Sequence, residues 1–166
     1  MANKIPKINE NDEVIGETTI PEAVENHWPR RISRVFVFDE AGNILLQKRS
    51  QTVLSYPGIW DQAVGGHVDI GEDYQTAALR EMDEEIGITG FELSEIETSF
   101  RNHVCFEGIF KASITREEKI TIDPHEVAEV RWFSITEFEE LAAADPDAFT
   151  PGFLIAWETF KHKLLQ

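Results

Sequence analysis

Residues 66–88 place the tightest constraint on the fold, because they combine the end of a strand pattern, a loop and an amphipathic helix. We expect the helix to begin near Asp73 or Tyr74 and to end at Gly87, since glycine commonly terminates helices. Its apolar residues recur at helical spacing: Ala78, Leu79, Met82 and Ile86. One face of this helix must therefore be buried against another layer of structure.

The opposite face of the same helix is acidic. At 100° per residue, Glu81, Glu84 and Glu85 fall within roughly 100° of arc. Like charges at this spacing destabilise an exposed helix by only roughly 0.2–0.5 kcal/mol per pair, so such a cluster alone is usually a solvated surface. Arg80 and Glu72 favour a binding site, because an arginine can orient carboxylates while a metal binds their other oxygens.

The rest of the chain contains more strand patterns than helix patterns. Strands are expected at residues 32–38, 44–48, 62–65, 91–100, 104–114, 120–122 and 127–133. Helices are expected at 21–26, 136–144 and 150–164, with Thr19, Thr136 and Thr150 as their caps. This mixed order predicts an α/β (α+β) fold, in which helices cover both faces of a mixed β-sheet.

The length and the charge of the chain limit its organisation and its partners. A chain of 166 residues is expected to form one main domain, residues 30–166, preceded by a hairpin or arm, residues 1–29. The net charge of -16 disfavours nucleic-acid polymers and anionic membranes as partners, whereas a small phosphorylated substrate is compatible if a bound cation offsets the charge.

Cys105 is the single cysteine, so no intrachain disulfide is possible, and its apolar strand context indicates a buried core residue. Neither a secretory leader nor a membrane span is recognisable in the sequence, and we therefore expect a cytoplasmic location. Whether the protein is a monomer or a homodimer is left open.

The spacing from Gly66 to Ile88 resembles the Nudix box at every specified position. The resemblance implies an α/β/α sandwich and a hydrolase that cleaves a phosphoanhydride bond in a (nucleoside) diphosphate linked to another moiety, with Mg²⁺ or Mn²⁺ as its cofactor. It further implies that the metal ligands are Glu81, Glu84, Glu85 and the Gly66 carbonyl. Glu72 and Arg80 are then the residues that hold the site in shape.

Two carboxylates compete for the role of general base, which the box does not fix. One is Glu85, within the box and next to Glu84, and the other is Glu126, on a later loop. Possible substrate contacts from outside the acidic helix are Arg31, Arg49, His67 and Trp60. A solvated charge explains Arg31 and Arg49 equally well, and buried packing explains Trp60 at least as well. A histidine on a loop, such as His67, more often contacts neither a metal nor a phosphate.

Two alternatives to hydrolysis are considered. The runs RISRVFVFDEAGNILLQKRS and PGIWDQAVGGH also resemble isopentenyl diphosphate isomerases and their hydrolase relatives. The isomerases carry a catalytic cysteine where this chain has Gly65, and metal-binding glutamates where it has Arg101 and His103, which favours hydrolysis. The second alternative is a regulatory domain that binds a metabolite without catalysis, and the complete box argues against it.

Overall fold

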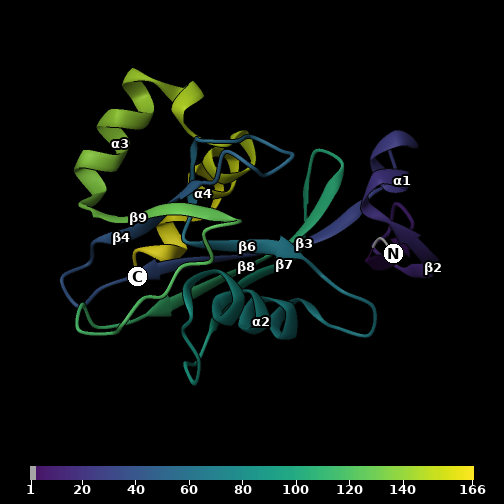
Figure 1. Cartoon of the computed structure of the whole chain (residues 1–166), viewed down its shortest axis with the longest axis horizontal. Helices are drawn as coiled ribbons and strands as arrows, with labels where there is room; N and C mark the ends of the chain where they lie inside the picture. Colours follow the sequence, from purple (N-terminus) through teal and green to yellow (C-terminus); the bar gives the residue numbers. More distant parts are fainter. Residues whose placement is uncertain (1–2) are drawn as a thin grey trace.

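The computed structural model describes residues 3–166, which form a mixed β-sheet with helices on both faces and a small two-stranded sheet at the N-terminal side (Figure 1). In chain order the elements are β1 (Lys4–Ile8), β2 (Val14–Thr19), α1 (Ile20–Glu25), β3 (Arg30–Phe38), β4 (Ile44–Arg49), β5 (Trp60–Gln62), β6 (Val64–His67), α2 (Tyr74–Ile86), β7 (Ser94–Asn102), β8 (Cys105–Ser113), β9 (Val127–Phe133), α3 (Ile135–Ala144), η1 (Pro146–Ala148) and α4 (Pro151–Leu164).

The main sheet has the strand order β5-β4-β3-β8-β7, while β6 also pairs with β3 and β9 with β4. Strands β3 and β8 are parallel over their full length, from the pair Arg30–Cys105 to the pair Phe38–Ser113, and the other pairings are antiparallel. The predicted mixed sheet is therefore confirmed. Because β3 and β8 are parallel, their first residues lie at the same end of the sheet, and the pocket described below is found there.

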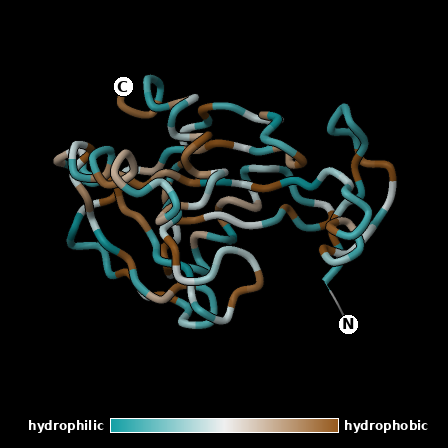
Figure 2. The backbone as a smooth tube through the Cα atoms, turned by 90° about the horizontal axis from the view of Figure 1, so that it is seen from above, coloured by the Kyte–Doolittle hydropathy of each residue, from teal (hydrophilic) through white to brown (hydrophobic). Residues whose placement is uncertain are grey.

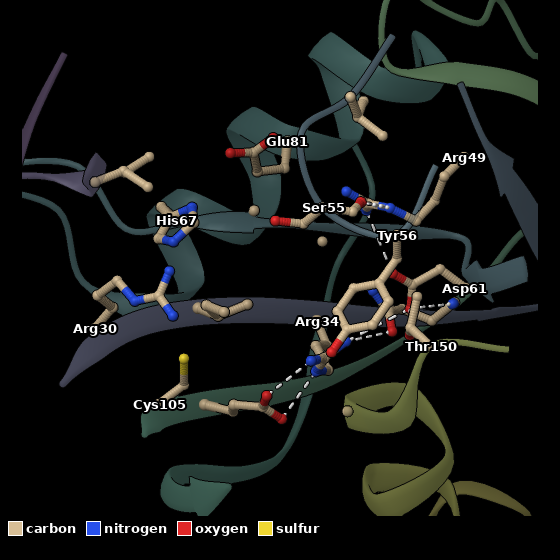
Figure 3. Close-up of a pocket in the computed structure, with 18 of the residues that line it drawn as sticks. Arg30, Arg34, Arg49, Ser55, Tyr56, Asp61, His67, Glu81, Cys105 and Thr150 are labelled. Carbon is tan, nitrogen blue, oxygen red and sulfur yellow. Dashed lines mark hydrogen bonds and ion pairs between the residues drawn. The ribbon is translucent and has the colours of Figure 1, made fainter. Parts of the chain in front are cut away.

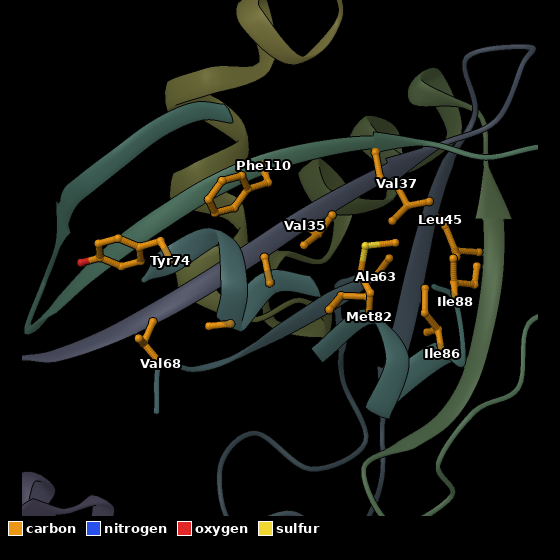
Figure 4. Close-up of a cluster of buried hydrophobic side chains, with 14 of the residues drawn as sticks. Val35, Val37, Leu45, Ala63, Val68, Tyr74, Met82, Ile86, Ile88 and Phe110 are labelled. Carbon is orange, nitrogen blue, oxygen red and sulfur yellow. The ribbon is translucent and has the colours of Figure 1, made fainter. Parts of the chain in front are cut away.

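Each face of the sheet has its own hydrophobic core. On one face, α2 buries Tyr74, Met82 and Ile86 against strand residues that include Val35 and Phe110 (Figure 4). On the other face, α3 and α4 cover a largely aromatic cluster. The members of this cluster include Phe36, Phe133, Phe138, Phe153 and Trp157.

The N-terminal strands and α1 form a small lobe beside the main body (Figure 2). Asp12, in the turn between β1 and β2, connects this lobe to the body. Its carboxylate accepts hydrogen bonds from Arg31 (2.6 Å), from the Tyr74 hydroxyl (2.8 Å) and from Ser99. The three donors belong to β3, α2 and β7, so they hold the lobe against these elements. Asp12 is buried, which shields its bonds from water.

Several expectations about local structure need correction. Residues 120–122 form no strand, because they run past the end of α2, where the Thr121 amide donates to the Ile86 carbonyl at 2.9 Å. Ser134, rather than Thr136, caps α3 and binds the Glu137 amide at 3.1 Å. β7 begins at Ser94 instead of residue 91.

Two further corrections concern side chains. Leu79 is exposed, so it does not belong to the buried face of α2. Thr150 is the N-cap of α4 by position, but its hydroxyl donates to Asp61 at 2.8 Å instead of capping the helix.

Cys105 is buried and free, as expected. Among residues 3–166, no helix is both long enough and apolar enough to cross a membrane.

Candidate active site

A pocket of about 780 Å³ lies where β3, β6, the acidic face of α2 and the beginning of α4 meet (Figure 3). Side chains alternate along β3, as they do in any strand. Arg30, Ile32 and Arg34 line the pocket, whereas the Ser33 hydroxyl points to the other face and donates to the Tyr74 carbonyl at 2.6 Å. The first half of β3 thus supplies two arginines to the pocket floor.

Both ends of α2 are fixed by local interactions. The Asp73 carboxylate accepts a hydrogen bond from the Thr76 amide at 2.7 Å, which makes it the N-cap. Gly87 ends the helix in the left-handed conformation, with φ 68°, and its amide donates to the Asp83 carbonyl. A helix fixed at both ends holds its acidic residues at a constant position relative to the pocket.

Two consecutive glycines in β6 let carboxylates of α2 reach the pocket. A Cβ at Gly66 would lie only 2.0–2.6 Å from the carboxyl atoms of Glu81, so no side chain fits there while Glu81 keeps its position. The Gly65 amide donates to Glu85 Oε2 at 3.1 Å. The glycine that opens the box is therefore explained by close approach of the helix side chains.

Arg80 gathers the acidic residues of the box around one guanidinium. Its five N–H groups make five hydrogen bonds: two to Glu72 (2.8 and 3.0 Å), one to Glu81 (2.7 Å), one to Glu84 (3.0 Å) and one to the His67 carbonyl (2.9 Å). We call Glu72, Arg80, Glu81, Glu84 and Glu85 the box cluster. Every donor of Arg80 is used, so the arginine fixes the geometry of three carboxylates at once.

Two members of the box cluster are buried carboxyls with perturbed acidity. Burial raises the pKa of Glu81 to about 7, and Glu84 and Glu126 add to this effect while Arg80 opposes it. Burial, followed by the charge of Glu81, raises the pKa of Glu85 well above its usual value, although Gly65 and Gln47 donate to one of its oxygens. Both groups would ionise more readily beside a cation.

Glu126 joins the box residues at the pocket from the loop that precedes β9. The Ser50 amide donates to its backbone carbonyl at 2.9 Å, and its own amide donates to the Asp123 carbonyl at 3.1 Å. Its negative charge contributes to the raised pKa values of both Glu81 and Glu85. The structure therefore brings together the two carboxylates, Glu85 and Glu126, between which the sequence leaves the role of base open.

Of the four expected substrate contacts, the structure brings only Arg49 and His67 to the pocket. Burial, with a contribution from Arg30, lowers the pKa of His67 to about 4, and its Nε2 atom is buried without a hydrogen-bond partner. Arg31 points to the opposite face and binds Asp12, because adjacent strand residues alternate. Trp60 packs edge-on against Phe133, with ring centroids 5.2 Å apart, and does not line the pocket.

A second group of charged residues lies at the pocket, and of its members only Arg49 was predicted from the sequence. Arg34 makes a bidentate pair with Glu107, with both N–O distances 2.8 Å, and lies 3.6 Å from Asp61. Arg49 lies 3.5 Å from the other oxygen of Asp61. We call Arg34, Arg49, Asp61 and Glu107 the strand cluster. The signal for it was a charged residue inside an otherwise apolar strand, as in ISRVFVF and CFEGIF.

The donor set of the box cluster suits a hard divalent cation, which prefers carboxylate, carbonyl and water oxygens. Arg80 binds one oxygen of Glu81, and Gln47 and Gly65 bind one oxygen of Glu85, so each carboxylate keeps a second oxygen for a ligand. Within residues 3–166, however, no three acidic, histidine or cysteine side chains are arranged as a complete metal-binding group. A bound cation would therefore need oxygens from water or substrate as well.

The fold and this pocket define an α+β domain in which an acidic helix borders a cavity. The model of the NUDIX domain matches residues 28–153. The chain therefore belongs to the Nudix family, whose hydrolases are of the pyrophosphohydrolase type.

Named relatives cover nearly the whole chain. An uncharacterized Nudix hydrolase of Listeria monocytogenes is 33% identical over 154 residues, which span 89% of this chain and 88% of that protein. An isopentenyl-diphosphate Delta-isomerase of Photorhabdus laumondii is 28% identical and covers 88% of this chain and 85% of its own length. The crystal structure of DR0079 from Deinococcus radiodurans shares the fold, with a TM-score of 0.76 and 21% identity. The match covers 86% of this chain and 90% of that chain.

Proposed function

We propose that the protein is a divalent-metal-dependent hydrolase that cleaves a phosphoanhydride bond in a small diphosphate linked to another moiety. The observation that carries the proposal is the box cluster, in which one arginine aligns carboxylates along a pocket. Glu81, Glu84, Glu85 and the Gly66 carbonyl would hold Mg²⁺, or Mn²⁺ in its place. When bound, the ion would supply charge neutralisation and lower the pKa of bound water.

Glu126 is the residue that we assign as general base. Glu85 already accepts two hydrogen bonds and is 3% exposed, whereas Glu126 is an exposed carboxylate at the pocket with its backbone fixed on both sides. As a water oxygen forms its bond to phosphorus, Glu126 takes the proton. The bridging P–O bond breaks, and its electron pair leaves with the second phosphate.

Isomerisation is disfavoured by the space around Gly65. A Cβ at this position would lie 2.4 Å from Gln62 Nε2, and Gln62 is itself buried and accepts from Arg34 at 2.7 Å. A cysteine at this position would therefore require the amide group of Gln62 to shift.

The test is phosphate or pyrophosphate release by the purified protein with Mg²⁺ on a panel of nucleoside diphosphate derivatives and isoprenoid diphosphates. We expect turnover on at least one compound and its loss by roughly 10²- to 10⁴-fold in Glu126→Gln. Glu84→Gln and Glu85→Gln are expected to require more Mg²⁺ for half-maximal rate, because each removes a proposed ligand. Exposed Glu25→Gln is the control for loss of one charge.

No turnover on any compound would refute the hydrolase proposal and favour a binding domain. Unchanged turnover in Glu126→Gln, together with loss in Glu85→Gln at saturating Mg²⁺, would move the role of base to Glu85.

A further inference from the structure

Arg30 differs from every other arginine of the described chain. Seven of the eight arginines lie within 4.0 Å of a carboxylate oxygen, and Arg30 is the exception. In a protein with 31 acidic residues against 15 basic ones, an unpaired arginine is unexpected. No hydrogen bond from its guanidinium is present within residues 3–166, and its Nε atom is buried.

This cation lacks both water at Nε and a protein partner. A buried donor without an acceptor has lost its hydration without compensation, which costs free energy unless a ligand supplies the acceptor. Glu107, a carboxylate that lines the same pocket, is already held by Arg34 through two hydrogen bonds. The buried Nε atom of Arg30 is therefore satisfied neither by solvent nor by a protein acceptor.

The surroundings of Arg30 form part of the same pocket as the box cluster. Figure 3 shows its guanidinium directed toward the ring of His67, at the opposite end of the pocket from Tyr56 and Arg49. His67 also has a buried ring nitrogen, Nε2, without a partner. His67 directly follows Gly66, the glycine against which the Glu81 carboxylate packs, and Arg30 and Glu81 line the same pocket.

We propose that Arg30, with His67 beside it, forms an anion subsite that binds phosphate oxygens of the substrate and fixes the direction in which the diphosphate lies in the pocket. The assignment rests on the proposed function, since it takes the substrate to be a diphosphate. The charge-assisted bonds of a guanidinium are suited to phosphate oxygens. One end of the diphosphate then lies at Arg30, and the remainder of the substrate extends toward Tyr56 and Thr150.

The subsite is tested without catalysis by calorimetric titration of the protein with sodium pyrophosphate, in EDTA and separately with Mg²⁺. We expect Arg30→Gln to weaken binding roughly 10- to 100-fold, because one or two charge-assisted hydrogen bonds are lost. Arg30→Lys, which keeps the charge, is expected to lose less. The matched control is Arg131→Gln, which removes an arginine whose side chain is 49% exposed and paired with Glu137, and should change affinity less than about twofold.

A second measurement separates binding from folding and from the proposed function. Circular dichroism checks that each variant is folded, and on any diphosphate that is hydrolysed, Arg30→Gln should raise KM more than it lowers kcat. Hydrolysis with pyrophosphate binding that is independent of Arg30 overturns the subsite alone. Pyrophosphate binding that depends on Arg30, without hydrolysis of any compound, supports the subsite and refutes the hydrolase. No pyrophosphate binding in either buffer overturns the subsite.

Discussion

The strand cluster and, apart from Glu72, the box cluster line the same pocket but differ in charge balance. The strand cluster has two arginines and two carboxylates, so its formal charge is zero. The box cluster has one arginine against the four carboxylates of Glu72, Glu81, Glu84 and Glu85, which gives -3 when all are ionised. One cluster is neutralised by its own residues, whereas the other is not.

The difference separates a structural role from a binding role. Buried ion pairs tolerate low dielectric when each charge has a partner, as Arg34 and Glu107 do. Burial also raises the pKa of Asp61, but Arg34 and Arg49 oppose this effect. Burial of Glu81 and Glu85 beside further acids raises their pKa values, which is a cost to the folded protein that a bound cation would remove. We therefore assign the strand cluster to stability and the box cluster to ligand binding.

The largest expected effect on stability is that of Glu107→Gln in the strand cluster. It leaves Arg34, which is 8% exposed, without its bidentate carboxylate, and breaking such a buried pair costs about 3 kcal/mol of unfolding free energy. Urea denaturation measures this loss. The control Glu137→Gln breaks the exposed Arg131–Glu137 pair and should cost less than about 1 kcal/mol.

Equal losses for Glu107→Gln and Glu137→Gln would contradict the assignment, because the buried cluster would then contribute no more than a surface pair. A large loss of Mg²⁺ affinity in Glu107→Gln, with unchanged stability, would show that the two clusters have exchanged roles.

The sequence predicted the box cluster because its geometry is local. Helical spacing alone places Glu81, Glu84 and Glu85 on one face, and the C-terminal glycine marks the end of the helix. The strand cluster was not predicted, because Arg34 and Glu107 are 73 residues apart and meet only through the parallel pairing of β3 with β8. Strand register is a non-local property that spacing in one segment does not reveal.

The sequence also could not show which of two neighbouring arginines faces the pocket. Arg30 and Arg31 are adjacent in the sequence, but a strand directs them to opposite faces, and only the folded sheet shows which face carries the pocket. Arg31 was expected to contact substrate, whereas the turn at Asp12 binds it. The three residues 120–122 have the alternation of a strand, yet the backbone pairs with the end of α2 instead of with the sheet.

An intermediate effect is expected for Gly66→Ala in the box cluster. The added Cβ would lie 2.0–2.6 Å from the Glu81 carboxyl atoms and must displace them, so a proposed metal ligand moves. We expect a loss of Mn²⁺ affinity of roughly 10- to 100-fold, measured by calorimetry. Gly16→Ala is the control for an added methyl group, since its Cβ would meet nothing within 4 Å, although the φ of 159° at Gly16 makes the substitution strained in the backbone. Unchanged Mn²⁺ affinity in Gly66→Ala would exclude Glu81 as a ligand held at this position.

The smallest expected effect is a pH-dependent gain in stability for Glu81→Gln in metal-free protein. The folded-state pKa of Glu81 is about 7, above its ordinary value of 4.5, so the folded protein holds this proton more tightly than the unfolded chain. The resulting stabilisation is complete below pH 4.5 and is lost as pH rises through 7. At pH 8 the variant should therefore be more stable than wild type by on the order of 1–2 kcal/mol, less the lost bond to Arg80.

Urea denaturation in EDTA at pH 5 and pH 8 measures this gain. The same measurement with Mg²⁺ tests whether a bound cation reverses it. If the excess charge of the box cluster exists to bind a cation, Mg²⁺ at pH 8 should stabilise wild type more than Glu81→Gln, because binding to the folded state adds stability in proportion to affinity. A variant that is less stable than wild type at pH 8 in EDTA would mean that the bond to Arg80 outweighs the cost of burying this carboxylate. Glu81 would then stabilise the folded protein, as the residues of the strand cluster do, and the difference in role between the two clusters would not hold for this residue.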